Sequence, residues 1–196
     1  MTNYSFPVPL SSIVPFNRNL HSPSEQTMIV NLGRPDMPLA TEDQPDRASD
    51  VVKSLTVIDR VSHFRVRGIK PAVESLQTIF NRIADDEPAL AEAIGYAGML
   101  VVRLRRPTSG VPSHKISNHA WGTATDFNID GGTPPGNTGQ TVPLGIAKLV
   151  PYFNQAGWYS GVAFHDDMHF EVATETIEQW SKEGRFKADV ASAATV

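Results

Sequence analysis

Cysteine is missing from all 196 residues of this chain. Its absence excludes disulfides, thiolate metal sites and cysteine nucleophiles, so a metal or catalytic site must be built from other side chains. For the same reason the sequence does not reveal the redox state of its compartment. A chain of this length can bury a hydrophobic core without covalent cross-links, which suits one domain with extensions.

Long apolar runs and an excess of positive charge are also lacking. No run approaches the roughly 18 apolar residues of a membrane span, and the formal net charge is -4. We therefore expect no membrane span and no nucleic acid bound through a broad basic surface. The first residues lack the basic and apolar regions of a signal peptide, so we expect a cytoplasmic protein or one released by a non-Sec route. We also expect a monomer.

Residues 1–50 differ in composition from the rest of the chain. They are rich in proline, serine, asparagine and aspartate, with little periodicity. Proline fixes φ and removes a backbone donor, so long regular elements are not expected there. We predict an irregular, proline-rich N-terminal arm over 1–50, a folded domain over 51–186 and a flexible tail over 187–196.

The rest of the chain mixes strand and helix patterns. Apolar residues at helical spacing predict an amphipathic helix over 71–83, and further helices are expected at 88–94, 144–156 and around 177–180. Short strands are expected at 55–58, 64–67, 99–104, 123–129 and 168–172. Strands and helices without a regular βαβ order predict an α+β fold, with a small antiparallel sheet and flanking helices.

Two histidines and one aspartate form the candidate metal site. His119 and Asp126 lie seven residues apart, and Gly122 with its β-branched neighbours favours a tight turn feeding a strand over one continuous helix. His169 lies on another short strand. Two imidazoles and one carboxylate leave a fourth position open for water, which is the pattern of catalytic zinc. Asp166, three residues before His169, is placed to accept a proton from that water; its neighbour Asp167 is the rival.

Two motifs resemble the zinc D-alanyl-D-alanine peptidase family. Residues 117–126, Ser-Asn-His-Ala-Trp-Gly-Thr-Ala-Thr-Asp, are similar to its Ser-x-His-x-x-Gly-x-Ala-x-Asp signature. Residues 166–171 resemble its second motif, an acid three residues before a zinc-binding histidine, and Ala156-Gly157-Trp158 resembles the helix end before that motif. The similarity covers about Ile69 to Val172. It implies a hedgehog/DD-peptidase-like fold and makes 51–186 a zinc peptidase catalytic domain.

The resemblance implies roles for single residues. It assigns one zinc ion to His119, Asp126 and His169, and the general base to Asp166. It also implies an arginine upstream of the first motif that stabilises the substrate carbonyl or its oxyanion. Three arginines are candidates for this role, namely Arg103, Arg105 and Arg106. We favour Arg105.

Three more residues are candidates for supporting the site. Ser117 can hold the first ligand by hydrogen bonding. Glu171 shares a strand face with His169 and can orient that ligand. Trp121 is a candidate cleft residue, although packing in the core fits it equally well.

The resemblance also implies the substrate. The family includes D-alanyl-D-alanine carboxypeptidases and dipeptidases, and phage L-alanoyl-D-glutamate endolysins, so we expect stem peptides of peptidoglycan in a cleft bordered by the 131–143 loop. Either carboxypeptidase or endopeptidase activity fits. Aspartate in place of glutamate at position 166 is typical of the endolysin-like branch.

Two other functions fit parts of the pattern. A mononuclear iron oxygenase also uses two histidines and a carboxylate, but it usually places the carboxylate two residues from the first histidine, on a β-barrel. A non-catalytic zinc module that binds a wall fragment or a protein partner is the second alternative. The acid at position 166 argues against this module, because a site without turnover needs no base.

Overall fold

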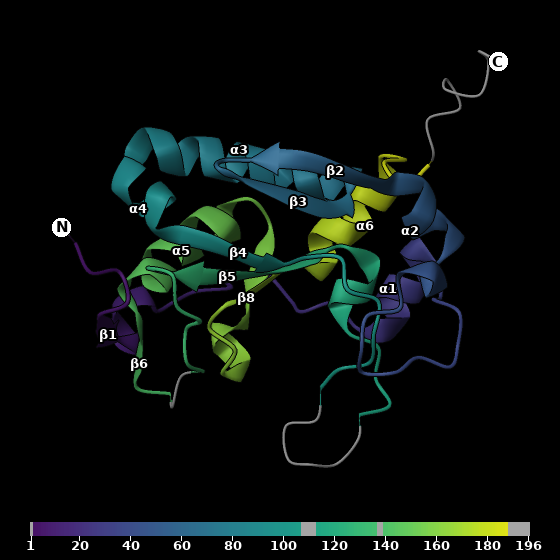
Figure 1. Ribbon diagram of the computed structural model, residues 1–196, viewed down its shortest axis with the longest axis horizontal. Coiled ribbons are helices and arrows are strands. Elements are labelled where there is room, and N and C mark those ends of the chain that lie inside the picture. Colours follow the sequence, from purple (N-terminus) through teal and green to yellow (C-terminus); the bar gives the residue numbers. More distant parts are fainter. Residues whose placement is uncertain (1, 107–112, 137–138, 188–196) are drawn as a thin grey trace.

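A four-stranded antiparallel sheet lies at the centre of the computed structural model, which describes residues 2–106, 113–136 and 139–187 (Figure 1). In spatial order its strands are β4 (Ile94–Gly98), β5 (Ala124–Ile129), β8 (His169–Val172) and β7 (Trp158–Ser160). Side chains alternate between the two faces of a strand. Phe127 and Phe170 therefore enter the core from β5 and β8, while Asp126 and His169 point to the opposite face.

Two helices cover the apolar face of this sheet. In α3 (Lys70–Asp86) the buried residues follow helical spacing, and Pro71 lies in its first turn, where proline is tolerated. In α5 (Leu144–Gln155) Phe153 packs on Phe170 with ring centroids 4.2 Å apart, and Phe80 of α3 lies 5.5 Å from Phe127. These aromatic contacts join the helices to β5 and β8, the strands of the candidate site.

Smaller elements surround this core. A hairpin of β2 (Thr56–Val61) and β3 (Phe64–Ile69) runs alongside α3 (Figure 1). The pair β1 (Pro7–Pro9) and β6 (Thr141–Pro143) joins the beginning of the chain to the segment before α5. The other helices are α1 (Glu25–Leu32), α2 (Asp50–Leu55), α4 (Pro88–Ala93) and α6 (Thr174–Lys182). The 3₁₀ helices are η1 (Leu10–Ile13), η2 (Pro45–Arg47), η3 (Asn118–Trp121) and η4 (Gly161–Phe164).

The predicted α+β class and small antiparallel sheet are confirmed. The strand expected at 99–104 is wrong: β4 occupies 94–98, and the following residues form only an isolated bridge between Leu104 and Ile116. Their backbone groups bond instead to the arm and to η3, a long-range pairing that β-propensity does not reveal. In the described ranges, no helix combines the length and apolar character needed to cross a membrane.

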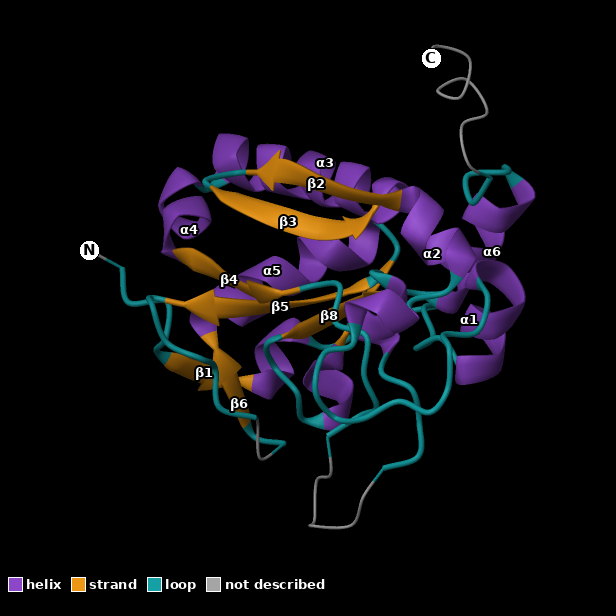
Figure 2. Cartoon of the chain, turned by 45° about the vertical axis from the view of Figure 1, so that its right-hand side comes forward, coloured by secondary structure: helices purple, strands orange, loops and turns teal. Residues whose placement is uncertain are grey.

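The N-terminal arm holds more regular structure than its proline content predicts. Helix α1 begins after Ser24, whose hydroxyl accepts a hydrogen bond from the Thr27 backbone N–H, and it buries Met28 and Leu32. Figure 2 shows α1 beside α6. The prediction of an irregular arm is therefore wrong for residues 25–32. The boundary between arm and domain stays a prediction, and the expected flexible tail falls, beyond Lys187, outside the described residues.

Candidate metal centre

Three side-chain atoms from different elements converge on one point. His119 Nε2 comes from η3, Asp126 Oδ1 from the middle of β5, and His169 Nδ1 from the start of β8. The two imidazole nitrogens are 3.2 Å apart, and Asp126 Oδ1 lies 3.3 Å from His119 Nε2 and 3.0 Å from His169 Nδ1. Asp126 and His169 face each other directly in the β5–β8 register. The sheet therefore sets two ligands, and the turn before β5 brings the third.

The outer nitrogen of each ring is already bonded. His119 Nδ1 lies 2.8 Å from the carbonyl oxygen of Met99, which can only accept, so this nitrogen carries the hydrogen. His169 Nε2 lies 3.0 Å from a carboxylate oxygen of Glu171 and donates in the same way. In the neutral rings, both inner nitrogens therefore present lone pairs to each other and to Asp126. A cation at the centre removes this repulsion.

The spacing of the three atoms suits zinc. Zinc–nitrogen and zinc–oxygen bonds of about 2.0–2.1 Å in a tetrahedron place ligand atoms about 3.3–3.4 Å apart, close to the 3.0–3.3 Å measured here. Three protein ligands leave the fourth tetrahedral position for water or substrate, as in catalytic zinc sites. The donor set and its geometry therefore fit a single zinc ion.

Proton affinities in this cluster are strongly shifted. Burial opposes the charge on Asp126, but its close contacts with the imidazoles of His119 and His169 hold the pKa of Asp126 well below its usual value. Burial likewise opposes a charged His169, yet its bonds to Asp126 and Glu171 raise the pKa of this imidazole to about 10. The site thus attracts positive charge strongly enough to hold a proton when no metal is bound.

Glu171 is held in turn by Asn118, a residue that sequence reasoning missed. Asn118 Nδ2 donates to Glu171 Oε2 over 2.7 Å and to the carbonyl of Pro23 over 3.3 Å. Both side chains are buried, and the bond from His169 keeps the pKa of Glu171 below its usual value despite that burial. This chain of bonds supports the expected orienting role of Glu171 and connects His169 to the arm. Position 118 falls on a variable place of the motif, so no signal identified it.

Asp166 lies in the turn between η4 and β8, where its carbonyl accepts the backbone N–H of His169. A side chain at Gly161 would come within 2.5 Å of the Asp166 carbonyl oxygen and 2.9 Å of His169 Cβ, so glycine is needed there. Partial burial raises the pKa of Asp166, and His169, Asp126 and His119 are near enough to interact with it electrostatically. Its rival Asp167 is buried, whereas Asp166 is open to solvent. Of the two acids, Asp166 is therefore the one that solvent can reach.

The structure points to a different arginine from the one the sequence favoured. Arg105 is exposed, and its Nε bonds to the carbonyl of Ile116. Arg103 is half-buried; burial and neighbouring Arg106 lower its pKa, while Asp126 and Asp166 act in the opposite direction. Both acids of the site thus interact electrostatically with Arg103. Strand alternation had placed Arg103 and Arg105 on one face, but this segment is not a regular strand.

Two other candidates have mainly structural positions. Trp121 is fully buried, and its indole N–H donates to the carbonyl of Gly33 over 2.8 Å. It therefore packs in the core, and its proposed place in the cleft is wrong. Ser117 is also buried; its backbone N–H donates to Arg103, and its carbonyl accepts from Ala120. It thus shapes the turn that carries His119 through its main chain.

An aromatic ring and a loop border the site. Phe164, at the end of η4, is 45% exposed, and its ring centroid lies 5.6 Å from that of His169. The described part of the 131–143 loop approaches the same turn, because a side chain at Gly136 would meet the carbonyl oxygen of His165 at 2.5 Å. Residues 137–138 lie outside the described ranges. The sequence did not single out Phe164, since a lone aromatic carries no positional signal.

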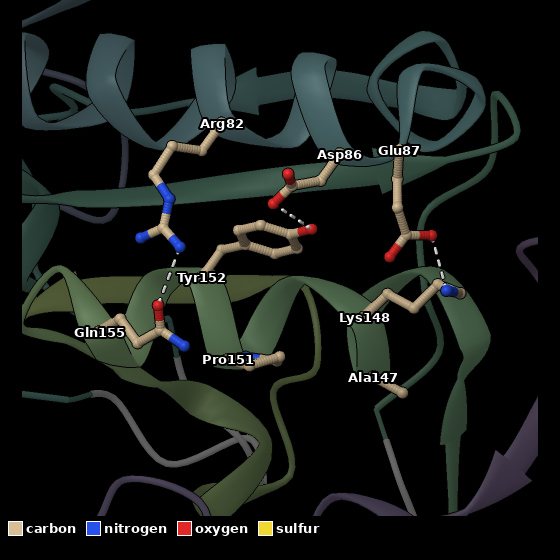
Figure 3. A pocket seen from close by; sticks show the side chains of 8 residues that line it. All are labelled: Arg82, Asp86, Glu87, Ala147, Lys148, Pro151, Tyr152 and Gln155. Atoms are coloured by element: carbon tan, nitrogen blue, oxygen red, sulfur yellow. Dashed lines mark hydrogen bonds and ion pairs between the residues drawn. The ribbon is translucent and has the colours of Figure 1, made fainter.

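A separate cavity of about 410 Å³ lies between α3 and α5, away from the metal ligands (Figure 3). Polar pairs cross it: Lys148 bonds Glu87 over 2.6 Å, and Tyr152 bonds Asp86 over 3.2 Å. None of the three convergent residues lines this cavity. It is therefore not part of the candidate metal centre.

The part of the chain that matches a known protein family contains both motifs. Residues 111–172 match the D-alanyl-D-alanine carboxypeptidase family model. The resemblance inferred from the motifs is thus confirmed, over a shorter range than the predicted 69–172. This family match, together with the convergent His119, Asp126 and His169, supports a zinc-dependent peptidase. Searches of curated proteins and of solved structures found no match to this chain.

Proposed function

We propose that this protein is a zinc peptidase that hydrolyses peptide bonds in the stem peptides of peptidoglycan. The observation that carries the proposal is the convergence of three lone-pair donors, with an acid beside them, inside the segment that matches the family model. His119, Asp126 and His169 would hold a zinc ion, which would supply a Lewis acid to polarise the carbonyl and acidify water.

Asp166 serves as the general base and acid. Its carboxylate takes the proton of the attacking water and returns it to the leaving amine. Its raised pKa supports this double role, because a carboxyl group that holds a proton more readily can also deliver it at higher pH. Arg103 donates to the carbonyl oxygen as negative charge develops there. We assign this role to Arg103 rather than Arg105 because it interacts with both Asp126 and Asp166.

The substrate class rests on the family description and on the residue at position 166. Aspartate there resembles the endolysin-like branch, whereas the description of the matched family names a carboxypeptidase. Both activities act on stem peptides, and we propose this substrate class for either bond. A monomeric protein remains part of the proposal.

Digestion of purified muropeptides by the zinc-loaded protein tests the proposal. We expect mass spectrometry to show new peptide termini, either loss of the terminal D-alanine or cleavage between L-alanine and D-glutamate. A chelator should abolish the products, and zinc should restore them. Asp166→Asn keeps the side-chain size, and we expect kcat to fall about 10²- to 10⁴-fold with the zinc content unchanged.

His114→Ala is the matched control, because His114 is exposed and is not among the convergent ligands. Full zinc content without cleavage of any muropeptide would overturn the proposal and favour the non-catalytic zinc module. Nearly normal turnover by Asp166→Asn would instead remove only the assignment of the base.

A further inference from the structure

The segment that carries Arg103 lies against residues 40–44 of the N-terminal arm. The Leu104 backbone N–H donates to the carbonyl of Ala40 over 2.7 Å. The Gln44 backbone N–H donates to the carbonyl of Val102 over 2.8 Å, and the Val102 N–H donates to Asp43 Oδ1 over 2.7 Å. Both neighbours of Arg103 are therefore bonded to the arm.

The other side of this segment contacts the turn of the first zinc ligand. The Val101 N–H donates to the carbonyl of His119 over 3.1 Å, and the Ser117 N–H donates to that of Arg103 over 3.0 Å. The arm, the Arg103 segment and η3 are thus joined in that order. A displacement of residues 40–44 is therefore transmitted to Arg103 and, through its segment, to the turn of His119.

The side chain of Arg103 has an unused donor. Its Nη1 donates to the carbonyl of Leu104 over 3.1 Å, but its Nε is buried and has no hydrogen-bond partner among the described residues. A buried donor left unsatisfied is costly. Asp43 of the arm and the site acids Asp126 and Asp166 all interact electrostatically with this guanidinium.

We propose that residues 40–44 hold the segment of Arg103 in place, and that Asp43 is a positioning residue for this arginine. The inference rests on the proposed function, because it gives Arg103 a role at the substrate carbonyl. Asp43 acts by holding the Val102 backbone next to Arg103 and by placing a negative charge near the guanidinium. The arm then contributes to catalysis through the position of Arg103.

A double-mutant cycle tests this coupling on the full-length, zinc-loaded protein. Asp43→Ala should lower kcat on muropeptides about 10- to 100-fold, because a small displacement of a catalytic group has effects of that size. KM and zinc content should change little, since an interaction made only in the transition state affects kcat. In an Arg103→Ala background, Asp43→Ala should have no further effect on kcat.

Two further variants separate the causes. Asp43→Asn keeps an oxygen acceptor for the Val102 N–H, so it should recover most of the kcat lost in Asp43→Ala. Asp46→Ala removes an exposed acid three residues along the same arm and should leave kcat unchanged. Equal losses from Asp43→Ala with and without Arg103, or no loss at all, would overturn the proposal.

Failure of the proposed function gives a different result. If the zinc-loaded wild type cleaves no muropeptide, the coupling is read from its affinity for a phosphinate dipeptide, whose tetrahedral oxygens resemble the transition state. Asp43→Ala should then weaken phosphinate binding only when Arg103 is present. Unchanged phosphinate affinity would refute the positioning role independently of turnover.

Discussion

At the residue scale, the two histidine ligands present opposite ring nitrogens to the centre. His119 points Nε2 inward because Met99 accepts from its Nδ1, and His169 points Nδ1 inward because Glu171 accepts from its Nε2. These outer bonds fix the orientation of each ring before a metal arrives, and they select the tautomer of the neutral ring that binds it. The groups that bond to the outer ring nitrogens therefore also contribute to metal binding. Asn118 bonds to Glu171 and connects it to the arm.

The shifted pKa of His169 predicts that zinc uptake releases a proton. With a pKa raised to about 10, the imidazole is protonated at pH 7 in the metal-free protein, and zinc needs its Nδ1 lone pair. We expect about one proton released per zinc at pH 7, and weaker zinc affinity as pH falls. Isothermal titration calorimetry in buffers of different ionisation enthalpy measures the number of protons released per zinc ion.

The same shifts set the pH dependence of the metal-free fold. The raised pKa of His169 adds stability below its unfolded value near 6.5, and this is lost as pH rises through about 10. The lowered pKa of Asp126 adds stability above its unfolded value near 3.8, and this is lost on acidification. Zinc binding with no dependence on the buffer would contradict the raised pKa of His169. His21→Ala, which alters an exposed pair with Glu175, is the control.

At the element scale, the site depends on one turn and one strand register. The antiparallel register of β5 and β8 sets Asp126 opposite His169. The turn of η3 ends at Gly122, which has φ of +63°, and the Gly122 carbonyl accepts the N–H of Ile69 at the end of β3. His119 is thereby fixed against the hairpin as well as the sheet.

Replacing Gly122 tests this placement. An alanine Cβ there would lie 3.0 Å from the Ile69 backbone nitrogen, whereas at Gly131, with φ of +76°, it would meet nothing within 4 Å. We expect Gly131→Ala to cost about 1–2 kcal/mol from the backbone conformation alone. Gly122→Ala should cost about 1–3 kcal/mol more from overpacking and should weaken zinc binding. Urea unfolding of both variants measures the difference, and equal costs would show that close packing at Gly122 is unimportant.

At the scale of the whole molecule, the arm and the remaining chain share one core. Met28 and Leu32 of α1 are fully buried in the same apolar cluster as the core residues of α3, β5 and α5. The strand pair β1–β6 and the bonds between residues 40–44 and 102–104 add contacts elsewhere along the arm. The arm is therefore expected to unfold together with the domain.

Two substitutions in α1 test this cooperativity. Leu32→Ala should lower the free energy of unfolding by about 2–5 kcal/mol, the usual cost of emptying a buried leucine site. Val30→Ala, at a position 71% exposed in the same helix, should change it by less than about 0.5 kcal/mol. Thermal unfolding of both variants should show one transition. A separate early transition in Leu32→Ala would mean that the arm folds independently.

Periodicity and motif spacing in the sequence were sufficient to predict local helices and strands. The apolar spacing from Pro71 to Ile83 predicted α3, and the alternation before Ile129 predicted β5. The segment after Gly98 was misassigned, because its bonding partners lie far away in the arm and in η3. Helix α1 was missed because prolines on either side outweighed a short apolar pattern.

By itself, the sequence determined the class of the fold and the three convergent residues, because helical spacing, strand alternation and ligand motifs are local patterns. Only the tertiary structure decided which arginine lies near Asp126 and Asp166, and that Trp121 belongs to the core. The same holds for Asn118 and Asp43, whose partners are 53 and 59 residues away. Contacts over such separations depend on how the elements pack, and packing leaves no periodic trace in a single sequence.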